Sequence, residues 1–271
     1  MRDNNGIGQK SGIKLWAIAV LLIIWQIASM ILKQEILLVS PFKAGLRIFE
    51  LALETGFWRA VGFSFIRIVI GFIGAAVSGV VLAGFAARFD RIEELLSPIV
   101  LVVKSTPVAS FIILALIWIP SRNLSIFISF LMSFPVVYTN VLQGVRNSDR
   151  KLLEMASLFK VGNYRLVRYI YLYQVMPFFY TACQLSLGLS WKAGIAAEVI
   201  ALPRGSIGER LYQAKIYLET YDLFAWTVVI IALSQFFEYA FLKGMGVILK
   251  NFGSFTKRDE NNESLTKKVS A

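Results

Sequence analysis

Long apolar runs are the sequence feature that most constrains how this chain can fold. Each run is about 20 residues long, enough for a helix to span the ~30 Å hydrocarbon core of a bilayer. Hydrophobic residues make up 57% of the 271 residues, above the roughly one half that is usual in a soluble domain. We therefore expect an all-α polytopic membrane protein.

Six apolar segments are predicted to be transmembrane helices. The first run follows Lys10 and Lys14, as the core of a signal peptide would. It is longer than such a core and has no small-x-small cleavage site before Lys33, so we expect an uncleaved helix. The six predicted helices are Ile13 to Ile31, Ala60 to Ala86, Leu96 to Ile119, Leu124 to Val145, Pro177 to Ile200 and Leu223 to Leu242.

The segment from Pro41 to Phe57 is less apolar than these six. Its larger apolar residues recur at helical spacing, which predicts an interfacial helix that lies flat on the membrane. These residues are Leu46, Phe49, Leu53 and Phe57.

The basic residues predict the orientation. With the N-terminus inside, 17 of the 28 lysines and arginines would be cytoplasmic and 8 would lie in external loops. Cytoplasmic loops of membrane proteins carry an excess of these residues, so we expect both termini in the cytoplasm. The net charge of +11 then follows from these loops, and we expect no nucleic acid as a partner.

Several chemistries are missing from the sequence. There is no histidine, and Cys183 is the single cysteine, so no disulfide framework is expected. The chain has no phosphate-binding G-x-x-x-x-G-K-[ST] loop and no clustered acids or nucleophile–base pair. We expect no catalytic residue, no metal and no cofactor.

Small residues form stripes on two predicted helices. One stripe is Gly71, Ala75, Gly79 and Ala83, and the other is Ala193, Ala197 and Ala201. Such stripes let helix backbones approach closely in lipid. They serve either packing within the chain or a subunit interface, and we expect the former.

A polar insert from Glu154 to Pro177 separates the fourth and fifth apolar helices. Asn147 or Ser148 is predicted to cap a short amphipathic helix that begins near Asp149. Its apolar face has to be covered by lipid, by this chain or by another protein, and periodicity leaves these three choices open. This face comprises Leu152, Leu153, Met155, Ala156 and Phe159.

Gly162 is predicted to stop this first helix. Asn163 can then start a second, basic and aromatic helix from Tyr164 to Tyr173, which leads to Pro177.

The insert resembles the EAA signature of permease subunits in binding-protein-dependent ABC importers. That pattern is Glu-Ala-Ala, three residues, Gly, nine residues and Ile-x-Leu-Pro. The chain matches it at Glu154, Ala156, Ile170 and Leu172, and Pro177 matches a second proline of the family. It departs from the pattern at Met155, Lys160 and Tyr173.

Two further segments resemble the nitrate/sulfonate/taurine-type permeases of this family. One runs from Lys192 to Phe224 and contains Ala197-Glu198, Gly205 to Gly208, and Asp222. The other runs from Lys104 to Ala109. The resemblance covers roughly Trp58 to Val247, in the family's order.

The resemblance implies a cytoplasmic coupling helix between helices four and five, docked on a separate ATPase subunit that uses ATP and magnesium. It also implies a second permease copy, an extracytoplasmic substrate-binding protein and a bacterial or archaeal cytoplasmic membrane. The domains would be 1–57 (first helix and interfacial segment), 58–247 (permease domain) and 248–271 (polar tail). The expected coupling residues are Leu152, Leu153, Glu154, Met155, Ala156, Phe159, Lys160 and Gly162.

Polar groups within the bilayer are candidates for the translocation path, because burying them in lipid is costly. Lys104 is one such candidate, and its alternative role is to snorkel to the membrane surface or to form an internal ion pair. The same alternatives apply to Arg67, which is not among the path candidates. Two lysines would favour an anion such as a sulfonate, nitrate or carboxylate, although Glu198 can offset part of their charge. The path candidates are Lys104, Thr106, Pro107, Trp191, Lys192 and Glu198.

The polar stretch from Leu202 to Tyr221, with Gly205 and Gly208 as turns, is either a plain connecting loop or the side that receives the binding protein.

A self-contained secondary transporter or channel is the alternative for the whole chain. Such proteins usually have inverted repeats or matched discontinuous helices, and the sequence shows neither.

Overall fold

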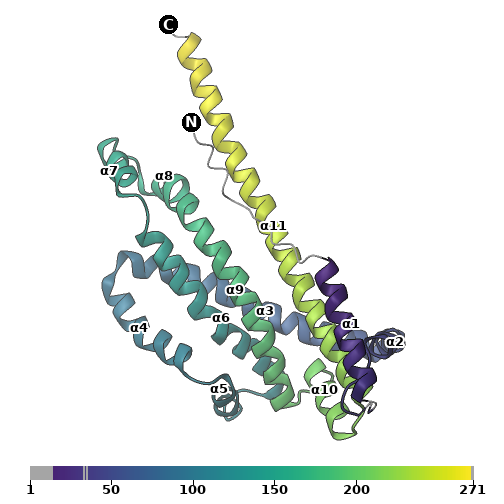
Figure 1. Cartoon of the computed structure of the whole chain (residues 1–271). Coiled ribbons are helices and arrows are strands. Elements are labelled where there is room, and N and C mark those ends of the chain that lie inside the picture. Colours follow the sequence, from purple (N-terminus) through teal and green to yellow (C-terminus); the bar gives the residue numbers. More distant parts are fainter. Residues whose placement is uncertain (1–14, 33, 35, 270–271) are drawn as a thin grey trace. The chain divides into compact units, whose positions relative to one another are not determined.

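The computed structural model describes residues 15–32, 34 and 36–269, which form helices joined by short turns (Figure 1). This part of the chain contains no strand, so the predicted all-α class is confirmed. The predicted start of the first helix at Ile13 lies outside the described residues. The helices are α1 (Leu15–Leu32), α2 (Pro41–Ala52), α3 (Thr55–Arg88), α4 (Asp90–Ser105), α5 (Val108–Ala115), α6 (Ser121–Arg146), α7 (Arg150–Leu158), α8 (Asn163–Leu166), η1 (Val167–Tyr171), α9 (Leu172–Ala201), α10 (Ile207–Ile216) and α11 (Thr220–Val269).

The chain divides into two compact units. One combines Met1–Trp58 with Arg210–Val229, and the other combines Arg59–Glu209 with Ile230–Ala271. The second unit contains α7 and all of the predicted coupling and path residues.

In the first unit, an ion pair joins α2 to the start of α11. Arg47 Nη2 donates to Asp222 Oδ2 at 3.1 Å, its Nε donates to Oδ1 of the same carboxylate, and its Nη1 donates to Glu50 at 2.9 Å. These hydrogen bonds, first to Asp222 and then to Glu50, raise the pKa of the Arg47 guanidinium above its usual value. A bidentate pair of this kind fixes orientation as well as adding energy.

The predicted interfacial helix is shorter than expected. Ser40 caps α2 by accepting from Lys43 N at 3.3 Å, and Pro41 takes the first helical position. The missing N–H group of a proline costs no hydrogen bond there, because the first N–H groups of a helix have no partner within it. The helix ends at Ala52, and α3 begins at Thr55. Leu46, Phe49 and Leu53 are exposed, whereas Phe57 is buried against Trp226, with ring centroids 5.0 Å apart.

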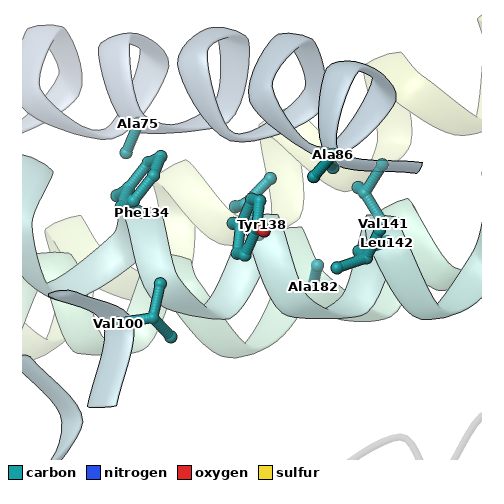
Figure 2. Close-up of a cluster of buried hydrophobic side chains, with 10 residues drawn as sticks. Ala75, Ala86, Val100, Phe134, Tyr138, Val141, Leu142 and Ala182 are labelled. Carbon is teal, nitrogen blue, oxygen red and sulfur yellow. The ribbon is translucent and has the colours of Figure 1, made fainter. Parts of the chain in front are cut away.

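The core of the second unit lies between α3, α4, α6 and α9. Figure 2 shows Phe134 and Tyr138 of α6 stacked along that helix, between Ala75 of α3 and Val100 of α4. Helices α6 and α9 lie side by side over much of their length (Figure 1). Aromatic and aliphatic burial of this extent supplies the packing that helices in lipid rely on.

Both small-residue stripes pack within the chain, as expected. A Cβ on Gly71 would collide with the carbonyl oxygen of Ile126, and one on Gly79 would lie 2.9 Å from Val137 Cγ1, so α3 and α6 approach to backbone contact. Ala193 and Ala197 are buried in a cluster with Ile112 of α5.

The prediction of one continuous helix from Leu96 to Ile119 is wrong. Helices α4 and α5 meet at a bend of 106°. Thr106 has ψ 135°, outside the helical region, because the ring of Pro107 disfavours a helical residue before it. The chain at this point is therefore a broken span or a re-entrant loop.

Fewer helices are long and apolar enough to span a membrane than the six predicted. Among the described residues these are Thr55–Arg88, Ser121–Arg146 and Thr220–Val247, with the bent α4–α5 pair as a fourth if it counts as one span. The predicted sixth helix is thus part of the longer α11. Beyond Gly253 that helix meets no glycine or proline and continues to Val269, through most of the segment that the sequence analysis gives as a polar tail.

Candidate functional site

Helix α7 begins at a side-chain cap. Asp149 accepts a hydrogen bond from Lys151 N at 2.9 Å, so the predicted cap at Asn147 or Ser148 is wrong by one or two residues. Asp149 N also donates to the side-chain oxygen Oε1 of Gln174, at 2.8 Å. This second contact ties the start of α7 to α9.

A tight turn at Lys160 ends α7. Lys160 has φ +51°, the left-handed conformation that glycine usually supplies. Val161 N donates to Ala156 O at 2.9 Å and Lys160 N donates to Ser157 O at 3.1 Å, the pair of bonds that defines a Schellman ending. The prediction that Gly162 provides the break is therefore wrong, because the turn lies at the glycine position of the EAA pattern.

The apolar side of α7 is exposed. Leu158 is 81% exposed, Phe159 77% and Met155 49%, and Leu152 and Glu154 are exposed as well. Ala156 is buried and Leu153 is half-buried. Within the described chain, only Ala156 and part of Leu153 are covered, and the rest of the predicted apolar face is exposed.

The connection from α7 to α9 is one nearly continuous helix. As expected, it begins at Asn163, and α8 runs through the π-helical turn η1 into α9. Tyr164 and Tyr173 are exposed, and Arg168 Nη1 donates to Tyr164 Oη at 3.2 Å. A π turn holds one residue more than an α turn and often marks a functional position.

The break between α4 and α5 presents three of the predicted path residues. Lys104 is exposed, and its Nζ donates to Thr139 Oγ1 of α6 at 3.3 Å. Thr106 Oγ1 donates to Val102 O at 2.8 Å, and Pro107 is exposed. Lys104 is therefore held by a neutral hydroxyl at the surface of the unit.

The path residues of α9 separate into two environments. Lys192 is exposed, whereas Trp191 is buried against Phe65, with ring centroids 5.8 Å apart. Glu198 is fully buried and bonded to Ser64 of α3 and to the start of α10. The sequence did not identify Ser64, because a lone serine within an apolar helix has no distinguishing pattern.

Arg67 is half-buried, and it contacts a backbone carbonyl and an aromatic ring. Its Nε donates to Arg122 O at 2.7 Å, and its guanidinium lies 3.5 Å from the ring centroid of Phe63. A guanidinium over an aromatic face is attracted by the ring, so the contact with Phe63 is stabilising.

Residues 79–243 match the family described as binding-protein-dependent transport system inner membrane component. The chain belongs to this family. It is a membrane protein of the ABC permease type, and the resemblance noted in its sequence is confirmed.

Curated relatives of this permease are named for three kinds of solute. The permease SsuC of Bacillus subtilis (strain 168), named for aliphatic sulfonates, is 26% identical over 78% of this chain and 77% of its own. The taurine transport system permease TauC of Escherichia coli (strain K12) is 24% identical over 83% of each chain. The nitrate import permease NrtB of Leptolyngbya laminosa is 24% identical over 64% of this chain and 59% of its own.

Proposed function

We propose that this permease is the membrane subunit of an importer driven by a separate ATPase. The observation that carries the proposal is the uncovered apolar surface of Met155, Leu158 and Phe159 on a short helix with a fixed cap and a fixed end. Apolar side chains exposed together mark a surface that another protein covers. In this proposal α7 is the coupling helix, and α7, its flanking residues and both termini are cytoplasmic.

ATP and magnesium would be used in the partner, since this chain has no phosphate-binding loop. Closure of the ATPase on nucleotide would move α7, and α9 with it through the Asp149–Gln174 contact. The two permease copies would thereby exchange between inward-facing and outward-facing states as rigid bodies. An extracytoplasmic binding protein would deliver the solute, as the family description implies.

The docking claim is tested by capture of the ATPase subunit on the purified permease. Phe159→Asp places a charge in the proposed interface, so we expect at least a tenfold loss of captured ATPase. Phe159→Leu is the matched control, because it keeps an apolar side chain at the same position, and we expect capture within about twofold of the unmodified protein. Equal capture by both variants would contradict the assignment of α7.

For the solute we propose a small anion. Sulfonates and nitrate are anions, and taurine carries a sulfonate group, so the names of the relatives share one chemistry. Lys104 and Lys192 are exposed cations, whereas Glu198 and Trp191 are buried within the unit. We therefore assign solute contact to the two lysines, with Thr106 and Pro107 beside Lys104, and assign no direct contact to Glu198 or Trp191.

A further inference from the structure

A buried carboxylate joins three helices at the end of α9 that is farthest from α7. Glu198 Oε2 accepts from Ser64 Oγ of α3 at 2.6 Å and from Gly208 N of α10 at 3.3 Å. Ser64 Oγ in turn accepts from Ile207 N at 3.0 Å. Two N–H groups in the first turn of α10, which have no partner inside their own helix, are thus satisfied by side chains of two other helices. We call Ser64, Glu198, Ile207 and Gly208 the Glu198 clasp.

The close approach of α10 to α9 depends on a missing side chain. A Cβ on Gly208 would collide with Glu198 Cβ and lie 2.5 Å from Val199 N. The sequence suggested that Gly208 forms a turn, but it lies inside α10. Its role is to let two backbones meet, which brings Gly208 N within reach of the carboxylate.

The chain between α9 and α10 forms a tight, hydrogen-bonded turn. Leu202 and Gly205 both have positive φ, +50° and +77°. Gly205 N donates to Glu209 Oε2 at 2.6 Å, and Glu209 N donates to Ser206 Oγ at 3.0 Å. Of residues 202–209, only Arg204 and Gly205 are exposed. This turn, which the sequence presents as a polar loop, is therefore built as a rigid corner.

We propose that Glu198 is a positioning residue, which locks α3, α9 and the start of α10 into one body so that the 202–209 corner follows α9 during transport. The proposal rests on the function proposed above. Helix α9 has 30 residues and is about 45 Å long at 1.5 Å per residue. Its first turns are tied to α7 by Gln174, and its last turn holds the clasp. Movement applied at α7 is thereby carried to the far end of α9.

The clasp acts through hydrogen bonding. Glu198→Gln keeps an acceptor oxygen of the same shape, whereas Glu198→Leu keeps similar bulk and removes the acceptor. Leaving a buried donor without its acceptor costs folding free energy. Glu198→Leu takes the acceptor from Gly208 N and also removes the group that orients Ser64 Oγ, the acceptor of Ile207 N. We therefore expect both N–H groups of α10 to open more often in the leucine variant. Ser64→Ala removes two of the three hydrogen bonds, the donation to Glu198 and the acceptor of Ile207 N, and leaves Gly208 N bonded to the carboxylate. It should therefore release the amide of Ile207 more than that of Gly208.

The test uses the assembled transporter, with ATPase subunits, in lipid nanodiscs. Hydrogen exchange at the amides of Ile207 and Gly208 should be at least tenfold faster in Glu198→Leu, and within threefold of the unmodified protein in Glu198→Gln. Stimulation of ATP hydrolysis by the binding protein should fall at least threefold in Glu198→Leu and be retained in Glu198→Gln.

Unchanged exchange in Glu198→Leu would overturn the clasp, and faster exchange with full stimulation would overturn its role in transport. If Glu198→Gln behaves like Glu198→Leu, the hydrogen-bonding account is wrong. If Glu198→Leu does not assemble, Ser64→Ala decides the same comparison. Absence of stimulation in the unmodified assembly would instead contradict the proposed function, so the two failures are distinguishable.

Discussion

Lys160 holds a backbone conformation that residues with a side chain rarely adopt. The left-handed region costs such a residue about 1–2 kcal/mol, and Lys160 lies in it at φ +51°. Gly162, two residues later, has open space around it. The sequence placed the break at Gly162 because residue type was the only available signal, whereas the turn is fixed by the bonds from Lys160 and Val161 back into α7.

The strain at Lys160 leads to a stability prediction. Lys160→Gly should stabilise the end of α7 by about 1 kcal/mol, because glycine adopts positive φ without steric cost. Hydrogen exchange at the amides of Lys160 and Val161, which close the turn, measures the change. Lys160→Ala is the control, since it removes the charge but keeps the strain. An equal gain in both variants would show that charge, and not backbone conformation, is responsible.

The exposed lysine of α9 gives a second prediction at this scale. Lys192→Met should lower uptake of an anionic solute at least tenfold while ATPase capture is retained, because the substitution removes the cation and keeps the length of the side chain. Uptake into proteoliposomes that contain the full assembly measures this. Lys215→Met is a suitable control, since Lys215 is an exposed lysine of α10. Unchanged uptake in Lys192→Met would exclude solute contact by this residue.

Polar residues in apolar helices show where prediction at this scale reaches its limit. The sequence identified Glu198 and Lys192 as unusual, but gave no means of separating their roles. The carboxylate is buried by contacts from Ser64 and Gly208, which are 134 and 10 residues away in the chain. A long-range partner of this kind leaves no local pattern, so burial could only be found from the structure.

At the scale of the elements, the π turn η1 determines how α7 is oriented relative to α9. One residue advances an α-helix by about 100°, so deletion of Tyr169 from η1 should turn the preceding segment by that angle. The apolar face of α7 would then point away from its partner, and we expect loss of ATPase capture. Tyr169→Ala is the control because it keeps the length of η1, and capture should be retained.

If the Tyr169 deletion binds the ATPase as well as Tyr169→Ala does, the orientation set by η1 is not required for docking. Folding of the deletion variant is checked separately, from its elution as a single species in detergent. The site for this experiment could not be chosen from sequence, which predicted an ordinary helix from Tyr164 to Tyr173.

Long apolar elements were the most predictable part of the chain. The sequence placed α3, α6 and the first part of α11 within a few residues, because their hydrophobic runs are long and uninterrupted. The α4–α5 break was missed, although Pro107 was identified as special. A proline inside an apolar run can kink a helix or end it, and the residue type does not say which, so the 106° bend was found only from the structure.

For the whole molecule, the rival to an ATP-driven importer is a carrier that works alone. Among the described residues the structure has one bent helix pair, α4–α5, which is a broken span or a re-entrant loop. Secondary transporters usually have discontinuous helices in matched pairs. We expect proteoliposomes that contain only this permease to show no solute uptake above that of protein-free vesicles. Addition of the ATPase, the binding protein and ATP should restore uptake, because in the proposed function the energy for transport comes from the ATPase.

Uptake by the permease alone, driven by an ion gradient, would contradict this assignment. A gradient-collapsing ionophore added to the complete assembly provides the internal control, since an ATP-driven importer should retain its uptake under these conditions.

Helix α7 has its own beginning and end, and this has a consequence for how such transporters diversify. The Asp149 cap and the Lys160 turn close the segment at both sides, while its side chains make few contacts with the rest of the chain. Residues 149–162 can therefore be exchanged as a cassette without rebuilding the core. Choice of motor and choice of cargo are in this way separable properties, which natural variation or protein engineering can change one at a time.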